Sequence, residues 1–173
     1  NQEGGCAVGV SGKDGALLKA RKLLAEDGRD LGQVGEITQV NKGFLELLLG
    51  QGYVPVVSPV GLGDDGQSYN INADAAAADV AAALGASKLI YLTDVAGILD
   101  KAGELVSELK ASDLEAELTT GAITGGMKVK TQSILKALRG GVERVHVIDG
   151  QTPHSVIAEL FTDRGVGTLV TLQ

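Results

Sequence analysis

Apolar runs alternate with helical patterns along most of this chain, and that alternation constrains the fold more than any other feature. Strands are predicted over 53–60, 88–95, 144–149 and 167–173, and helices over 39–52, 74–84, 107–121, 127–141 and 152–163. This order predicts an α/β fold, a three-layer αβα sandwich with a mostly parallel central sheet. The run at 88–95 is apolar throughout, as in a strand buried on both faces. Pro153 is placed in the first turn of the last helix, where proline is tolerated.

The beginning of the chain adds a β-hairpin near the N-terminus. Strands over 6–12 and 16–23 flank a turn that contains Gly and Asp, which is typical of a hairpin. The Gly-rich stretch 26–37 is predicted to be a loop. The 173 residues, of which 44% are hydrophobic, are enough for one domain or for two small lobes that share a core.

Charge and cysteine usage exclude several classes of protein. The net charge of −7 argues against a nucleic-acid binder, which needs a basic face. No apolar run approaches the ~18 residues that a membrane span requires. Cys6 is the only cysteine, so we expect no intrachain disulfide and a reducing, cytoplasmic location. His146 and His154 with this one cysteine do not make a zinc pattern, and no metal ligand is predicted.

The stretch NINAD carries three polar side chains at alternate positions before an Ala-rich segment. In an extended chain, Asn70, Asn72 and Asp74 lie on one side. Asn side chains donate and accept hydrogen bonds, so they suit a carboxylate or amide ligand. Asp74 falls where the N-cap of the helix is expected, and a plain capping role explains it about equally well.

The stretch GAITGGMKVK places cations at the wrong end of a helix. Gly125 and Gly126 open the predicted helix, with Lys128 and Lys130 in its first turn. The helix dipole disfavours positive charge there by roughly 0.3–1 kcal/mol for each lysine. A strongly negative ligand such as polyphosphate reconciles the lysines with the helix end, while two solvated surface lysines are the alternative.

The stretch LTDVAGIL follows the strand pattern at 88–92 and marks a ligand edge. Ligands of parallel sheets bind at the carboxyl ends of the strands. Thr93 and Asp94 are polar there, and Val95, Ile98 and Leu99 offer an apolar surface for a base. The alternative is a buried strand that ends in a tight turn at Gly97. The sequence has no GxxxxGK[ST] loop and no GxGxxG with dinucleotide-fold spacing, which argues against those two nucleotide sites.

Four stretches together resemble the acetylglutamate kinases of the amino acid kinase family. They are YNINADAAAADVAAALGASKLIYLTDVAGIL, TGGMKVK, GGVERVHVIDGQTPHSV and FTDRGVGTLV. The resemblance covers essentially all of the chain. It implies phosphorylation of the side-chain carboxylate of N-acetylglutamate by ATP with Mg²⁺, in arginine biosynthesis. It also implies small-molecule partners, no nucleic acid or membrane partner, and a homo-oligomer.

The resemblance assigns roles to residues that match the motifs of these kinases. Asn70 and Asn72 are implied to hold the acetylglutamate, Asp74 to orient the catalytic lysines, and Lys130 to stabilise the transferring phosphoryl group. The implied nucleotide-binding residues are Thr93, Asp94, Val95, Gly97, Ile98, Leu99, Ile123, Thr124, Gly126, Met127 and Lys128.

The chain departs from these kinases at its beginning. Their opening strand with a Lys and a Gly-Gly pair, their Gly-rich loop and a later substrate-binding Arg have no counterpart after Asn1. We therefore expect a partial acceptor-substrate lobe over 1–85 and a nucleotide-binding lobe over 86–173, in one continuous sheet. The alternative function is a truncated, catalytically impaired nucleotide-binding module of the same family. Arginine feedback is not expected, because the N-terminal helix of arginine-sensitive members is not found here.

Overall fold

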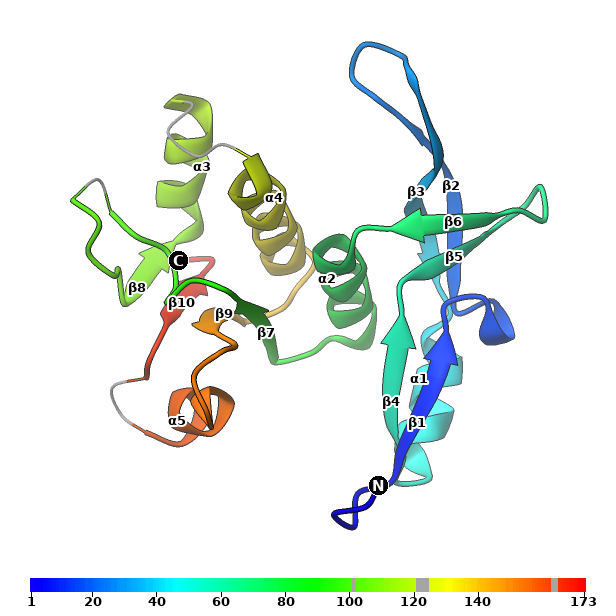
Figure 1. Cartoon of the computed structure of the whole chain (residues 1–173), viewed down its shortest axis with the longest axis horizontal. Coiled ribbons are helices and arrows are strands. Elements are labelled where there is room, and N and C mark those ends of the chain that lie inside the picture. Colours follow the sequence, from blue (N-terminus) through cyan, green and yellow to red (C-terminus); the bar gives the residue numbers. More distant parts are fainter. Residues whose placement is uncertain (101, 121–124, 163–164) are drawn as a thin grey trace. The chain divides into compact units, whose positions relative to one another are not determined.

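The computed structural model describes residues 1–100, 102–120, 125–162 and 165–173. They fall into two compact units, Asn1–Leu84 and Gly85–Gln173, and each has its own strands and helices (Figure 1). The assignment of the two predicted lobes, and one sheet continuous through both, stay predictions. Among the described residues, no helix has both the length and the apolar character to cross a bilayer.

The first unit combines a parallel strand pair, a small barrel and two helices. Its elements are β1 (Ala7–Ser11), the 3₁₀ turn η1 (Asp14–Ala16), β2 (Leu18–Leu24), β3 (Asp30–Val40), α1 (Lys42–Gly50), β4 (Val54–Ser58), β5 (Val60–Gly63), β6 (Ser68–Ile71) and α2 (Ala73–Leu84). Strands β1 and β4 pair in parallel. Strands β2, β3, β6 and β5 close into a barrel in that order.

The predicted hairpin between 6–12 and 16–23 is wrong in its strand pairing. β1 pairs with β4 instead, and the hairpin near the N-terminus consists of the antiparallel strands β2 and β3. Between β1 and β2, η1 redirects the chain with Gly15 at φ +57°. Leu17 and Leu18 are fully buried against Leu45 of α1. Burial of these leucines stabilises the first unit in the arrangement in which β1 pairs with β4. The local turn signal did not predict this pairing.

The loop predicted over 26–37 is also wrong, because most of it is strand β3. The glycines there have different roles. Gly28, at φ +80°, makes the β2–β3 turn, where its amide donates to the carbonyl of Ala25. Gly35 lies inside β3, where an added Cβ meets the Cβ of Tyr69 at 2.6 Å. In the sequence, a strand glycine that permits close packing cannot be distinguished from a loop glycine. This is why the segment was predicted to be a loop.

The second unit is a four-stranded sheet with helices. Its elements are β7 (Lys88–Thr93), β8 (Glu108–Lys110), α3 (Ala111–Thr120), α4 (Gly125–Arg139), β9 (Arg144–Asp149), α5 (Ser155–Phe161) and β10 (Thr168–Thr171). The strand order is β7-β9-β10-β8. The pairs β7–β9 and β8–β10 are parallel, and β9–β10 is antiparallel. With the pairings of the first unit, this makes a mixed α/β fold in which parallel pairs predominate, as predicted.

Helices cover both faces of β9. Val145, Val147 and Ile148 are fully buried, and His146 is nearly so. His146 contacts α5, whereas Tyr91, which is paired with Val147, faces a lysine of α4. Successive residues of a strand point to opposite faces, so His146 and Val147 face opposite sides, and Tyr91 shares the side of Val147. Helices α5 and α4 therefore lie on opposite sides of the sheet (Figure 1). This is the helix–sheet–helix layering that the sequence predicts.

Three details of the second unit differ from the sequence predictions. The segment predicted as one helix over 107–121 begins with strand β8, because Glu108–Lys110 pairs with β10. Helix α5 begins at Ser155, so Pro153 lies before it, and His154 caps it at φ +62°. β7 is not buried on both faces, since it is at the edge of its sheet and Leu92 is 57% exposed.

Candidate functional site

The carboxyl ends of β7 and β9 lie side by side. These parallel strands are in register, with Thr93 opposite Asp149, and the Gly150 amide donates to the Thr93 carbonyl at 2.8 Å. The Asp149 carboxylate accepts the Gln151 amide and the Thr152 hydroxyl, both at 2.8 Å. These hydrogen bonds hold the pKa of Asp149 below its ordinary value. The edge predicted to face a ligand therefore carries the ionised carboxylate of Asp149, which already accepts hydrogen bonds from the turn that follows β9.

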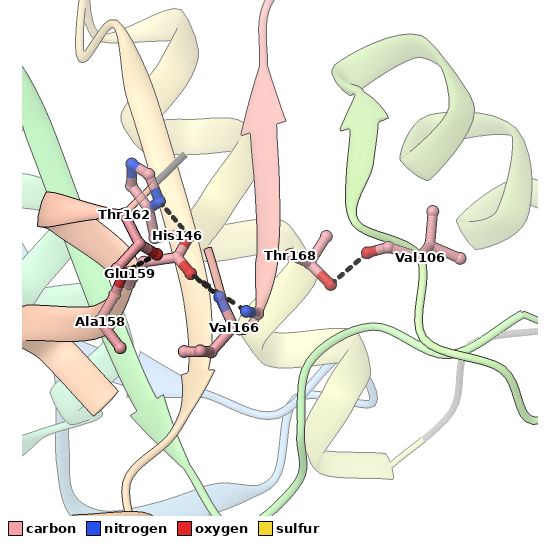
Figure 2. Close-up of polar contacts among 8 residues, drawn as sticks. Val106, His146, Ala158, Glu159, Thr162, Val166 and Thr168 are labelled. Carbon is pink, nitrogen blue, oxygen red and sulfur yellow. Dashed lines mark hydrogen bonds and ion pairs between the residues drawn. The ribbon is translucent and has the colours of Figure 1, made fainter. Parts of the chain in front are cut away.

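The loop after β7 is partly a structural anchor. The Ile98 amide donates to the Thr168 hydroxyl at 2.8 Å. That hydroxyl donates to the Val106 carbonyl at 2.7 Å (Figure 2). A Cβ on Gly97 would lie 2.6 Å from the Thr168 hydroxyl oxygen. Ile98 is 5% exposed and packs in the core. The nucleotide-binding roles of Gly97 and Ile98 stay predictions, and both residues have a structural role that explains them.

The remaining residues of this loop are more accessible. Asp94 is exposed and accepts the Thr93 hydroxyl at 3.2 Å, while Leu99 is 47% exposed. Val95 is half-buried. A polar pair followed by accessible apolar side chains is the arrangement that the sequence predicts for a nucleotide, and these nucleotide-binding roles stay predictions.

Helix α4 brings a lysine over β7. Gly126 and Lys128 are exposed in its first turn, and Met127 is half-buried. Lys130 lies in the second turn rather than the first, with its Nζ 4.9 Å from the centroid of the Tyr91 ring. The described first turn of α4 holds no acidic residue. Ile123 and Thr124, predicted to bind nucleotide, lie outside the described residues.

The NINAD segment of the first unit spans the end of a strand and the start of a helix. In β6, Tyr69 and Ile71 are buried and Asn70 is exposed, which is the expected alternation. The prediction that Asp74 caps the helix is wrong. Asn72 is the cap, because its Oδ1 accepts the Ala75 amide at 3.1 Å. Asp74 is inside α2. The extended chain in which Asn70, Asn72 and Asp74 were expected to share one side therefore ends before Asp74.

Replacing Asn72 by Ala is expected to lower the free energy of unfolding by about 1 kcal/mol, the usual contribution of an N-cap. Urea denaturation followed by circular dichroism measures this change. Asn72→Asp keeps the acceptor oxygen and is expected to stay near the parent protein. Asn70→Ala is the matched control on the exposed side of β6, with an expected change within about 0.5 kcal/mol. Equal losses in Asn70→Ala and Asn72→Ala would contradict the capping role.

A buried ion network in the second unit was not predicted from the sequence. His146 Nδ1 lies 2.7 Å from Glu159 Oε1, and Glu159 Oε2 accepts the amides of Val166 at 2.6 Å and Gly167 at 3.0 Å (Figure 2). The side chains of His146 and Glu159 are only 8% and 5% exposed. The sequence signal that could have indicated this network is the single glutamate within the mostly apolar segment SVIAELF. Charged residues are rarely buried unless they are paired, so a glutamate in such a segment indicates a partner.

The Glu159 network has a defined electrostatic balance. Burial raises the pKa of Glu159, but the hydrogen bonds from His146, Val166 and Gly167 outweigh it and hold the pKa below the ordinary value of 4.5. The pair lines a cavity of about 420 Å³ together with Lys88 and Arg144. Those two cations are the first residues of β7 and β9. This cavity is therefore at the opposite end of the strands from Thr93 and Asp149.

Comparison with known proteins places the chain in a family. Residues 1–149 match the amino acid kinase family, and the chain belongs to that family. It is 46% identical to the acetylglutamate kinase of Stutzerimonas stutzeri (strain A1501), over 99% of this chain and 60% of that protein. It is 50% identical to the acetylglutamate kinase of Geotalea uraniireducens (strain Rf4), over 97% and 60%. The chain thus spans about 60% of the length of these relatives.

Solved structures share the fold. The N-acetylglutamate synthase from Neisseria gonorrhoeae, complexed with coenzyme A and N-acetyl-glutamate, superposes with a TM-score of 0.86 at 32% identity. That match covers 95% of this chain and 38% of the synthase. The protein smu.665 from Streptococcus mutans UA159 superposes with a TM-score of 0.82 at 31% identity, over 99% of this chain and 63% of that one.

Proposed function

We propose that this chain is part of an ATP-dependent kinase that phosphorylates the side-chain carboxylate of N-acetyl-L-glutamate, a step of arginine biosynthesis. The relatives named acetylglutamate kinase, at 46–50% identity, support this substrate. The structural observation that carries the proposal is Lys130 on α4, held over Tyr91 of β7. This places a cation on the strand whose carboxyl end bears Thr93 and Asp94.

Phosphoryl transfer to a carboxylate has simple requirements. The carboxylate is already an ionised nucleophile, so no general base is needed. The enzyme must hold two anions together and stabilise the charge on the transferring phosphoryl oxygens. Lys130 is assigned to that charge, and Lys128 with the N-terminal end of α4 is assigned to the polyphosphate.

The two units receive different tasks in this proposal. The second unit binds ATP along the carboxyl end of β7 and the start of α4. The first unit contributes Asn70 to the acetylglutamate, and Asp74 orients the lysine. Asn72 is assigned to the acetylglutamate as well, in addition to its role as the cap of α2. Mg²⁺ accompanies ATP, bound mainly by phosphate oxygens and water, and no protein ligand is assigned to it.

The wider setting follows from the same proposal. A biosynthetic kinase of this kind has small-molecule partners, and we propose a cytoplasmic homo-oligomer. The alternative function is a nucleotide-binding module of the same family that does not catalyse phosphoryl transfer.

The test uses the full-length natural protein that contains this chain. Its intact mass is measured first, and the same sample is then titrated with MgATP and N-acetylglutamate while acyl phosphate is trapped as the hydroxamate. We expect a mass above 17.7 kDa, binding of both ligands, and hydroxamate formation that requires both. Nucleotide binding without hydroxamate would establish the alternative. Failure to bind MgATP would overturn both functions.

A further inference from the structure

We propose that Tyr91 is a positioning residue for Lys130, and that its ring holds the lysine ammonium ready for the phosphoryl group. This inference rests on the proposed function, because it concerns how Lys130 performs its assigned role. The observation behind it is the contact between Lys130 Nζ and the Tyr91 ring, 4.9 Å from the centroid, within the distance of a cation–π interaction.

The ring is well placed to act as a fixed support. Tyr91 is 4% exposed, and its strand neighbour in register, Val147, is fully buried. A side chain packed in this way has one stable orientation. Lys130 is half-buried and comes from α4, the helix on that face of the sheet. The contact therefore links α4 to a buried side chain of the sheet.

The direction of the strand gives the contact its functional meaning. Residues two apart on a strand share a face, so Tyr91 and Thr93 lie on the same face of β7. Thr93 is the last residue of β7. A lysine resting on the Tyr91 ring is thereby held one step from the carboxyl end of the strand, where a bound nucleotide is proposed.

An aromatic ring suits this task for an electrostatic reason. The ring attracts the ammonium through its quadrupole and carries no net charge. The Tyr91 contact therefore orders the long lysine side chain without adding a negative charge beside the phosphoryl oxygens. A lysine that is ordered before the reaction loses less conformational freedom when the transition state forms.

Two substitutions separate the ring from its hydroxyl. Tyr91→Phe keeps the ring face, and Tyr91→Leu keeps an apolar side chain but removes the ring. In the full-length protein, we expect Tyr91→Leu to lower kcat roughly tenfold with KM for ATP and acetylglutamate changed less than about threefold, because the ring orders Lys130, whose assigned role is to stabilise charge in the transition state. Tyr91→Phe is expected to stay within about twofold of the parent. A normal kcat in Tyr91→Leu, or an equal loss in both variants, overturns the proposal.

A second measurement reads the contact without using turnover. In protein labelled with ¹³C-lysine, the Lys130 Hε signal is expected upfield of the other lysines, because it lies over an aromatic ring. Lys130→Gln assigns that signal. It is expected to persist in Tyr91→Phe and to join the other lysine signals in Tyr91→Leu, and a signal that never stands apart overturns the contact. The proposed function is overturned if the parent protein is inactive and its Lys130 signal does not change when MgADP is added. In that case the lysine spectra of the parent protein and the two Tyr91 variants still test whether Tyr91 contacts Lys130.

Discussion

Replacing Lys130 by Met is expected to lower kcat of the full-length protein by about 10²–10³-fold, with KM for both substrates changed much less. Removing one preorganised group that stabilises transition-state charge typically has an effect of this size. Methionine has a similar length without the charge, so the substitution removes the ammonium and keeps an unbranched side chain of similar size. Steady-state rates measured by hydroxamate trapping give kcat and KM separately.

Lys136→Met is the matched control for this substitution. Lys136 is an exposed lysine in the last turns of the same helix, away from the end at which nucleotide is proposed. Its removal makes the same change in charge and side-chain volume, and we expect kcat within about twofold of the parent. A loss of less than about threefold in Lys130→Met, or equal losses in both variants, would remove Lys130 from its assigned role.

Replacing Glu159 by Gln is expected to lower the free energy of unfolding by about 2–4 kcal/mol. The carboxylate accepts hydrogen bonds from His146 and from the amides of Val166 and Gly167. A neutral amide has one acceptor oxygen, so its NH2 group faces either the two backbone amides or His146 Nδ1. In the second case Nδ1 must accept, and the imidazole proton moves to Nε2, a buried atom with no hydrogen-bond partner among the described residues. Either arrangement leaves a buried polar group unsatisfied. Urea denaturation gives the total change, and amide hydrogen exchange at Val166 and Gly167 locates it.

Glu143→Gln provides the control for the Glu159 substitution. Glu143 is exposed in the turn before β9, so the same chemical change there is expected to stay within about 0.5 kcal/mol. Unchanged protection of the Val166 and Gly167 amides in Glu159→Gln would show that the carboxylate does not hold them.

The Glu159 contribution is expected to depend on pH in one direction. The folded-state pKa lies below the ordinary value of 4.5, so the unfolded chain takes up this proton first. The stabilisation is therefore complete above pH 4.5 and is lost as the pH falls through the folded-state pKa. The stability difference between the parent protein and Glu159→Gln should shrink over that acidic range, and a difference that grows on acidification would contradict the sign.

Local sequence patterns predicted the elements correctly where the residues of a segment favour a single type of secondary structure. The Ala-rich helix that ends at Gly85, with φ +60°, and the strand at 144–149 have the predicted bounds to within a residue. The register of β7 and β9 also brings Thr93 and Asp149 together at one edge, as parallel strands require.

Local patterns failed where a residue has two meanings that only its neighbours distinguish. Gly35 resembles a loop glycine in sequence, but in β3 it makes room for Tyr69. The Asn72 and Asp74 side chains are both good caps, and the choice between them follows from the residue at which α2 begins. The pairing of β1 with β4 instead of β2 joins segments that are distant in the chain, which no turn signal encodes.

The sequence by itself determined the alternation of strands and helices, the layering they require and the family to which the chain belongs. These depend on the periodicity of apolar side chains and on local motifs, which are readable along the chain. Only the tertiary structure decided that Lys130 rests on Tyr91 and that Glu159 is buried beside His146. Both contacts join a helix to a strand, and the chain reveals them only after packing has set which faces meet, because an isolated helix and strand have no fixed relation to each other.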